Sequence, residues 1–160
     1  MEDLAQPSAV DPPWGIYPGK VDEKGRLKLP VDFQQYLSNA GNTKVFITSF
    51  DARIARIYPI SVWKETALLL KDSHEDAESA EDLWFTANDL GGSAELDSQG
   101  RLMMPAELRR ELNLENQPVH LEHYKGHIKV YSNTVYEERK KRAAENRAEK
   151  LKAFERRGLL

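Results

Sequence analysis

The chain contains the same ten-residue segment twice. Residues 21–30 read Val-Asp-Glu-Lys-Gly-Arg-Leu-Lys-Leu-Pro, and residues 96–105 read Leu-Asp-Ser-Gln-Gly-Arg-Leu-Met-Met-Pro, so five residue types recur in register 75 positions apart. The agreement extends further along the chain, where the apolar segment 45–47 matches 119–121. A repeated supersecondary unit of this size cannot bury its apolar face alone. We therefore expect one α+β unit in which two halves pack about a pseudo-twofold axis.

Both copies are expected to have the same local structure. A short strand leads into an Asp-x-x-Gly turn, a second strand follows, and a proline (Pro30 or Pro105) then begins a short helix, since proline is favoured in a first helical turn. The apolar pairs Phe33 and Leu37, and Leu108 and Leu112, are each expected to lie on one face of their helix. Runs of β-branched and aromatic residues next predict a hairpin in each copy, at 44–58 and at 119–131.

The segment between the copies is predicted to be helical and acidic. Residues 72–89 hold seven Asp and Glu residues and no Lys or Arg. Three consecutive large residues, Leu83, Trp84 and Phe85, are expected to face inward from this helix, and the pair Gly91-Gly92 is expected to end it.

After the second copy, residues 135–157 are predicted to form one long charged helix that ends at Gly158, with a capping box at Thr134 and Glu137. Its many Lys and Arg residues are interleaved with Glu, as expected for a solvated helix with i,i+4 pairs. The predicted organisation is a flexible leader at 1–13, a first repeat at 14–70, an acidic helical connector at 71–92, a second repeat at 93–138 and a charged C-terminal helix at 139–160.

The repeated Asp-x-x-Gly-Arg turn has a specific chemistry. The Asp carboxylate accepts backbone hydrogen bonds, the Gly supplies a positive φ, and the Arg that follows can be held by the Asp. A guanidinium fixed in this way suits phosphate oxygens or the edge of guanine. The alternative is structural, because a duplicated domain also duplicates its stabilising hairpin turns.

Net charge alone argues mildly against nucleic-acid binding. The chain has 23 Lys and Arg residues against 26 Asp and Glu, a formal charge of −3. The charge is nevertheless segregated, since the acidic residues concentrate in 72–89 while the tail at 139–157 is rich in Lys and Arg. A locally basic surface is therefore compatible with the composition.

Several function classes lack support in the sequence. There is no cysteine, and three of the four histidines, His120, His123 and His127, straddle a predicted hairpin without an accompanying carboxylate pattern. We expect them to be exposed strand residues and predict neither a metal site nor a cofactor. No phosphate loop or nucleophile arrangement stands out, so we do not expect an enzyme. No apolar run is long enough for a membrane span and no secretory signal is present, which favours the cytoplasm.

The two copies of Asp-x-x-Gly-Arg, each followed by an apolar residue, a proline and a short helix, resemble the MraZ family. Each half is similar to the swapped-hairpin element of AbrB. The resemblance implies a cytoplasmic, nucleoid-associated transcriptional regulator that forms a ring and binds short direct repeats in the promoter of the division and cell-wall gene cluster. It also implies that the Asp and Arg of the motif are signature residues and that Arg26 contacts DNA.

Double-stranded DNA and further copies of the chain are therefore the predicted partners, with no membrane. The first turn is expected to face DNA more strongly, because Gln99 and Met103 stand in the second copy where the first has lysines. The predicted DNA-binding residues are Asp22, Lys24, Arg26, Lys28, Asp97 and Arg101. Two alternatives remain open: an oligomeric scaffold that does not bind DNA, and an AbrB-like antitoxin, although such antitoxins usually carry one hairpin element plus a disordered tail.

Overall fold

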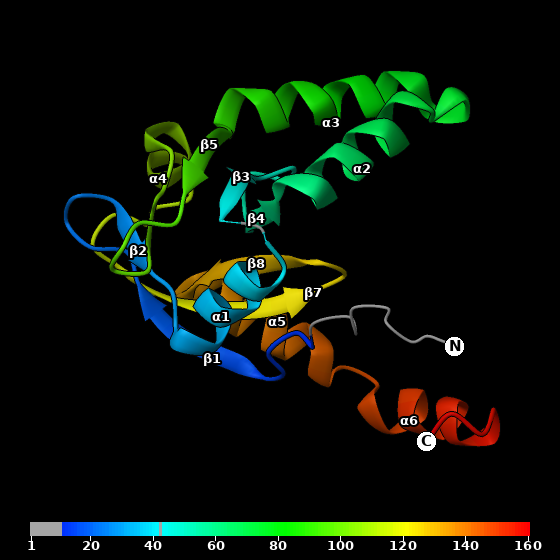
Figure 1. The fold of residues 1–160 in the computed structure, drawn as a ribbon. Coiled ribbons are helices and arrows are strands. Elements are labelled where there is room, and N and C mark those ends of the chain that lie inside the picture. Colours follow the sequence, from blue (N-terminus) through cyan, green and yellow to red (C-terminus); the bar gives the residue numbers. More distant parts are fainter. Residues whose placement is uncertain (1–10, 42) are drawn as a thin grey trace, which may run out of the picture.

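The structure is a computed structural model that describes residues 11–41 and 43–160 (Figure 1). The predicted leader at 1–13 therefore falls largely on residues 1–10, outside the described residues. The elements in chain order are β1 (Ile16–Lys20), β2 (Arg26–Lys28), α1 (Val31–Asn39), β3 (Lys44–Thr48), β4 (Ala55–Pro59), α2 (Ile60–Lys71), the 3-10 helix η2 (His74–Asp76), α3 (Ala77–Leu90), β5 (Gly92–Glu95), β6 (Arg101–Met103), α4 (Ala106–Glu111), β7 (Pro118–Tyr124), β8 (His127–Ser132), α5 (Asn133–Ala144) and α6 (Arg147–Arg156).

The two repeats exchange their first strands. Six strands form an antiparallel sheet in the order β1-β7-β8-β4-β3-β5. The first strand of each repeat, β1 or β5, pairs with the hairpin of the other repeat, through β7 or β3. If each strand is replaced by its equivalent in the other repeat (β1 by β5, β3 by β7, β4 by β8), the same strand order results, read from the other end. A pseudo-twofold axis therefore passes between β4 and β8. The predicted swapped-hairpin architecture with two related halves is confirmed.

The same axis passes through a separate two-stranded ribbon, β2–β6. Leu27 pairs with Leu102 at its centre. Each turn is also tied to the strand of the other repeat, since the Leu29 amide donates to the Gly100 carbonyl (3.0 Å) and the Met104 amide to the Gly25 carbonyl (2.9 Å). The position of either turn therefore depends on both repeats.

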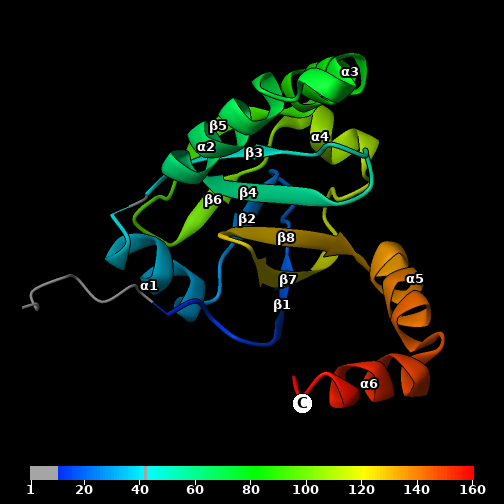
Figure 2. The same cartoon turned by 90° about the vertical axis from the view of Figure 1, so that its right-hand side faces the viewer.

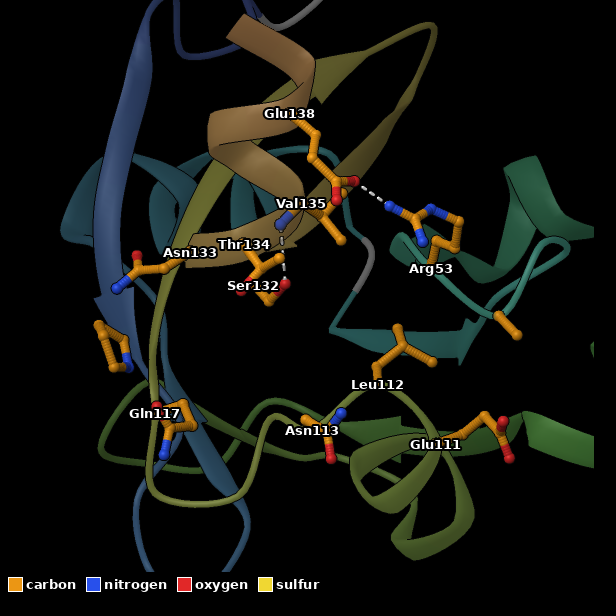
Figure 3. A pocket seen from close by; sticks show the side chains of 12 residues that line it. Arg53, Glu111, Leu112, Asn113, Gln117, Ser132, Asn133, Thr134, Val135 and Glu138 are labelled. Atoms are coloured by element: carbon orange, nitrogen blue, oxygen red, sulfur yellow. Dashed lines mark hydrogen bonds and ion pairs between the residues drawn. The ribbon is translucent and has the colours of Figure 1, made fainter. Parts of the chain in front are cut away.

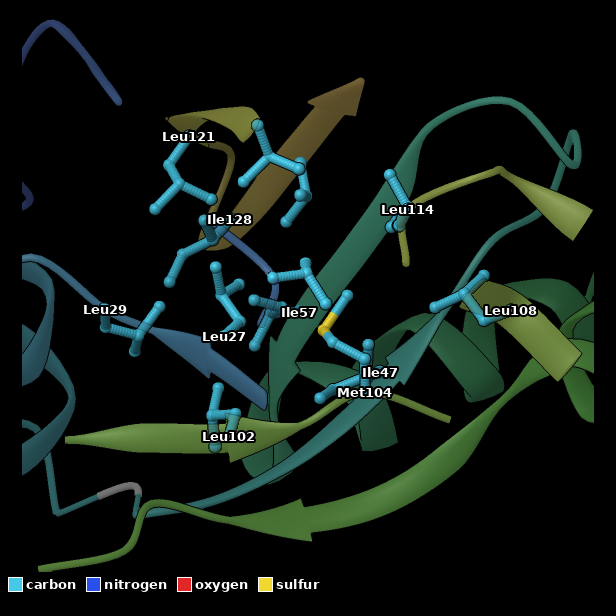
Figure 4. Close-up of a cluster of buried hydrophobic side chains, with 14 of the residues drawn as sticks. Leu27, Leu29, Ile47, Ile57, Leu102, Met104, Leu108, Leu114, Leu121 and Ile128 are labelled. Atoms are coloured by element: carbon cyan, nitrogen blue, oxygen red, sulfur yellow. The ribbon is translucent and has the colours of Figure 1, made fainter. Parts of the chain in front are cut away.

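One core fills the space between the ribbon and the inner face of the sheet (Figure 4). Alternate strand residues point into it, as the two-residue period of a strand requires. The short helices contribute one apolar face each, with Phe33 and Leu37 from α1 and Leu108 from α4, as predicted. Fully buried core side chains include Leu27, Leu29, Ile47, Ile57, Leu102, Met104, Leu114, Leu121 and Ile128.

A helical hairpin formed by α2 and α3 covers the outer face of β3 and β4 (Figures 1 and 2). Trp63 of α2 stacks on Phe46 at 4.6 Å and on Trp84 of α3 at 5.8 Å between ring centroids. The prediction that Leu83 and Phe85 face inward is wrong, because they are 40% and 70% exposed. Consecutive helical residues point in directions about 100° apart, so only Trp84 of the three lies on the packed face.

The charged C-terminal segment is helical, as predicted, but it consists of two helices. The chain leaves α5 at Glu145 and turns through Asn146, whose φ of 54° lies in the left-handed region. Ser132 caps α5 by accepting the Val135 amide at 3.2 Å, in place of the predicted capping box. Figures 1 and 2 show α6 at the periphery, beyond α5. None of the helices in residues 11–41 and 43–160 is long and apolar enough to cross a membrane.

His127 is buried, contrary to the prediction that the strand histidines are exposed. It is 6% exposed on the outer face of β8, where its ring stacks on Tyr58 at 4.5 Å. Its Nε2 lies 2.8 Å from Nη1 of Arg56. Arginine can only donate a hydrogen bond, so Nε2 accepts and the imidazole is neutral. Burial, with the nearby Arg56 charge, lowers the pKa of His127 to about 4.

We predict that the two leucines of the ribbon stabilise the fold jointly. Leu27→Ala and Leu102→Ala should each lower the free energy of unfolding by about 2–5 kcal/mol, because both side chains are fully buried. The double variant should lose less than the sum, with a coupling of about 0.5–3 kcal/mol, since the residues pair across the axis. Urea unfolding of the four proteins measures this, and strict additivity would contradict the pairing.

Acid should destabilise the protein through His127. In the unfolded chain the His127 imidazole has a pKa of about 6.5 and is protonated below that pH, whereas in the folded protein it stays neutral down to about pH 4. The contribution of neutral His127 to the free energy of unfolding is therefore fully present above pH 6.5 and is lost as the pH falls towards 4. In His127→Gln the urea midpoint should fall less steeply over this window. His123, whose pKa burial also lowers, acts with the same sign in both proteins, so the difference between their slopes isolates His127. Equal slopes would contradict the prediction.

Candidate nucleic-acid interface

The first turn holds its arginine through Asp22. Oδ1 of Asp22 accepts the backbone amides of Lys24 and Arg26, both at 2.9 Å, and Oδ2 accepts Nε of Arg26 at 2.9 Å. Gly25 closes the turn with a φ of 89°. The Arg26 amide and guanidinium, together with the Lys24 amide, keep the pKa of Asp22 below its usual value. The carboxylate thus stays charged and fixes the direction of the guanidinium.

The second turn repeats this geometry closely. Oδ1 of Asp97 accepts the amides of Gln99 (2.8 Å) and Arg101 (2.9 Å), and Oδ2 accepts Nε of Arg101 at 2.9 Å. Gly100 has a φ of 76°. The pKa of Asp97 is lowered by the same groups, the Arg101 amide first. The prediction that Asp holds Arg is therefore confirmed in both copies.

The ribbon brings the two arginines onto one face. Because Leu27 and Leu102 point into the core, the residues on either side of them point the opposite way. Lys28 lies across from Arg101, and Arg26 lies across from Met103. Lys24 and Lys28 are exposed beside them. All six predicted DNA-binding residues thus lie at the ribbon and its two turns, on the side of the molecule opposite α6 in Figure 1.

The charges on this face leave donors free. Arg26 and Arg101 each commit Nε to an Asp, and their side chains are 29% and 24% exposed. Within residues 11–41 and 43–160 the terminal nitrogens of Arg26 and Arg101 make no hydrogen bond, and Lys24 and Lys28 form no ion pair. Each guanidinium can therefore offer a second, outward-facing set of N–H donors to a bound acceptor.

Each turn glycine is covered by a side chain from the other repeat, a feature that the sequence analysis missed. Arg109 of α4 lies over Gly25, and Gln34 of α1 lies over Gly100. Arg109 and Gln34 occupy the same position in their repeats, 75 residues apart. The repeat alignment therefore contained the equivalence, but only the strand exchange reveals which turn each side chain meets.

A surface pocket lies away from the turns, between the start of α5 and the loop after α4 (Figure 3). Its lining is largely polar, and two of its charged residues, Arg53 and Glu138, form an ion pair with each other. The Ser132 hydroxyl, also in the lining, caps α5. The pocket therefore uses its Arg53–Glu138 pair and the Ser132 hydroxyl for contacts within the protein.

The histidines are placed separately from the turns. Within the described ranges, no three His, Asp or Glu side chains gather closely enough to hold a metal ion. Each of the three imidazoles of the β7–β8 hairpin has a partner within hydrogen-bond distance: His120 has Asn133, His123 has Tyr36 and His127 has Arg56.

Known proteins share this sequence pattern. A family model described as "MraZ protein, putative antitoxin-like" matches residues 92–157. A protein of Acidobacterium capsulatum named "Transcriptional regulator MraZ" is 34% identical over 105 residues, which cover 66% of this chain and 72% of the relative. A protein of the same name from Herpetosiphon aurantiacus is 37% identical over 109 residues, covering 66% and 71%. Another, from a Thermoanaerobacter species, is 28% identical over 129 residues, covering 78% and 83%.

These similarities agree with the fold. The two exchanged repeats, the paired Asp-x-x-Gly-Arg turns at 22–26 and 97–101, and the identity to these relatives lead to the same assignment. The chain belongs to the MraZ family.

Proposed function

We propose that this protein is a sequence-specific DNA-binding transcriptional regulator of the MraZ type. The observation that carries the proposal is the ribbon β2–β6, which presents Arg26 and Arg101 on one face with each guanidinium oriented by an Asp. The relatives named "Transcriptional regulator MraZ" support it.

The shape and chemistry of the ribbon fit the major groove of DNA, which admits a two-stranded β-ribbon. An oriented guanidinium can donate two hydrogen bonds to the edge of guanine, whereas flexible lysines suit phosphate oxygens. Arg26 is therefore assigned to base reading, and Lys24 and Lys28 to the backbone. The first turn is the stronger contact because the second carries Gln99 and Met103 at the corresponding places.

A single protomer offers few cations, and the chain as a whole is acidic, with a formal charge of −3. We propose that further copies assemble into a ring that presents several first turns to short direct repeats. Such multivalency can raise affinity by about 10²–10⁴ when the spacing matches. By resemblance to the family, the target is the promoter of the division and cell-wall gene cluster, and the protein acts in the cytoplasm at the nucleoid.

The assembly proposal has a physical basis in the sheet. Strands β1 and β5 end the six-stranded sheet, so each has one edge without a β partner in the described part of the chain. Open edges favour pairing or covering by another chain. Large apolar side chains are also exposed on the helical hairpin, among them Leu69 at 72% and Phe85 at 70%. Both features are expected to be covered by neighbouring copies.

Oligomeric state tests the ring. Multi-angle light scattering at micromolar concentration should give a mass that is several times the 18.3 kDa of the chain. A monomer at that concentration would contradict the ring and leave the multivalent mechanism without a basis.

DNA binding tests the assignment of residues. The probes are a duplex selected by the parent protein from a random library and an unrelated duplex of equal length. Arg26→Ala should weaken binding to the selected duplex by about 1–3 kcal/mol per engaged contact and reduce the preference for the selected over the unrelated duplex. Arg26→Lys should keep binding to the unrelated duplex but lose the preference, since lysine cannot copy the Asp-held fork. Lys24→Ala should weaken binding to both duplexes and flatten the salt dependence of the affinity. Anisotropy titrations at several salt concentrations measure these effects.

Lys152→Ala is the matched control, because this exposed lysine lies on α6, at the periphery of the molecule. The circular dichroism melt and the assembled mass are checked for every variant. If Arg26→Ala assembles and binds the selected duplex as the parent does, the turns are structural and the scaffold alternative replaces the regulator.

A further inference from the structure

The side chains that cover the two turns differ in the charge that they bring. A Cβ atom placed on Gly25 would lie 1.6 Å from Nη1 and 2.3 Å from Cζ of Arg109, so the guanidinium rests directly on the first turn. A Cβ on Gly100 would lie 2.2 Å from Cδ of Gln34, so a neutral amide rests on the second. The two contacts are equivalent by the pseudo-twofold axis, but only the first turn receives a cation.

Gln34 satisfies its polar group inside the protein, whereas Arg109 does not. Nε2 of Gln34 donates to the Leu29 carbonyl at 2.7 Å. Nε of Arg109 is buried without a hydrogen-bond partner. In the described part of the chain, Arg109 forms no ion pair, and its neighbours Arg110 and Glu107 pair with each other. A half-buried guanidinium whose N–H donors have no acceptor costs folding free energy unless a bound anion accepts their hydrogen bonds.

Neither carboxylate of the first turn, Asp22 or Glu23, forms an ion pair with Arg109 in the described part of the chain. Asp22 is already engaged by the Arg26 side chain and two backbone amides, and Glu23 is exposed to solvent. The guanidinium lies against Gly25, between Lys24 and Arg26 in the chain. An anion that reaches Arg109 must therefore approach the same surface on which Lys24 and Arg26 are presented.

We infer that Arg109, which the second repeat contributes to the surface of the first turn, contacts DNA there and binds a phosphate. This inference rests on the proposed function. Phosphate is the ligand rather than a base edge because no carboxylate orients the Arg109 guanidinium, and because its Nε is buried against the turn instead of projecting from the ribbon. The first-turn surface is thus a composite of both repeats.

The test replaces Arg109 by the residue that covers the other turn. Arg109→Gln removes the charge while keeping a side chain that already covers the equivalent glycine at Gly100. Its affinity for both the selected and the unrelated duplex should fall about three- to tenfold, and the slope of log K against log salt should flatten by about 0.9 per engaged protomer. The preference between the two duplexes should stay unchanged, which separates this residue from Arg26.

The matched control is Arg110→Gln, which removes the same charge from the same helix at an exposed, ion-paired position. It should bind both duplexes as the parent does. A double variant, Gln34→Arg with Arg109→Gln, keeps the net charge of the parent but moves the cation to the second turn, and it should remain weakened. If Arg109→Gln loses its thermal transition, Arg109→Met, which keeps an unbranched stem over Gly25, replaces it.

The outcomes separate the two proposals. If Arg26→Ala loses binding but Arg109→Gln matches Arg110→Gln, the inference is overturned and the proposed function stands. Full recovery of affinity in the double variant also overturns it, since total charge would then suffice. If the parent binds neither duplex, the proposed function fails and the inference fails with it. Weakened, salt-flattened binding in Arg109→Gln alone supports the composite surface.

Discussion

The hydrogen bonds that cross the pseudo-twofold axis determine both the fold and the position of the charged face of the ribbon. The Leu29 amide donates to the Gly100 carbonyl, the Met104 amide donates to the Gly25 carbonyl, and Leu27 pairs with Leu102 between them. Neither turn has its position from its own repeat alone. The same exchange sends β1 and β5 to the opposite hairpins, so that one repeat without the other would leave its strands unpaired and its apolar residues exposed. Stability and presentation of the charged face therefore have one common origin.

Local sequence signals predicted much of this arrangement. The spacing of Asp, Gly and Arg determined the turn geometry, and the apolar spacing of Phe33 and Leu37 determined which face of α1 is buried. These features depend on backbone hydrogen bonding and helical periodicity within a few residues. The repeat itself indicated two related halves, because equal patterns fold into equal units.

Other features depended on contacts between distant residues and could not be predicted. The alternation of β8 placed His127 on the outer face, but Arg56 and Tyr58 of the first repeat bury it there. The break at Asn146 has only a weak local cause, since asparagine tolerates a positive φ better than most residues and the surrounding charges favoured a continuous helix. At the ribbon, the motif predicted where the six candidate residues lie, while the contact of Arg109 with Gly25 was not predicted because it exists only after strand exchange.

Fusing two repeats into one chain frees the halves from having to be identical. A symmetric homodimer of one repeat would present the same side chains on both strands of the ribbon, and turning it end over end on a duplex would change nothing. Here Lys28 and Met103 occupy equivalent positions, as do Arg109 and Gln34. The ribbon therefore has a polarity, and on a duplex bound as proposed its two orientations would differ in energy. A DNA-binding surface with such a polarity would distinguish one direction along the duplex from the other. A palindromic site has no such direction, whereas a run of direct repeats does.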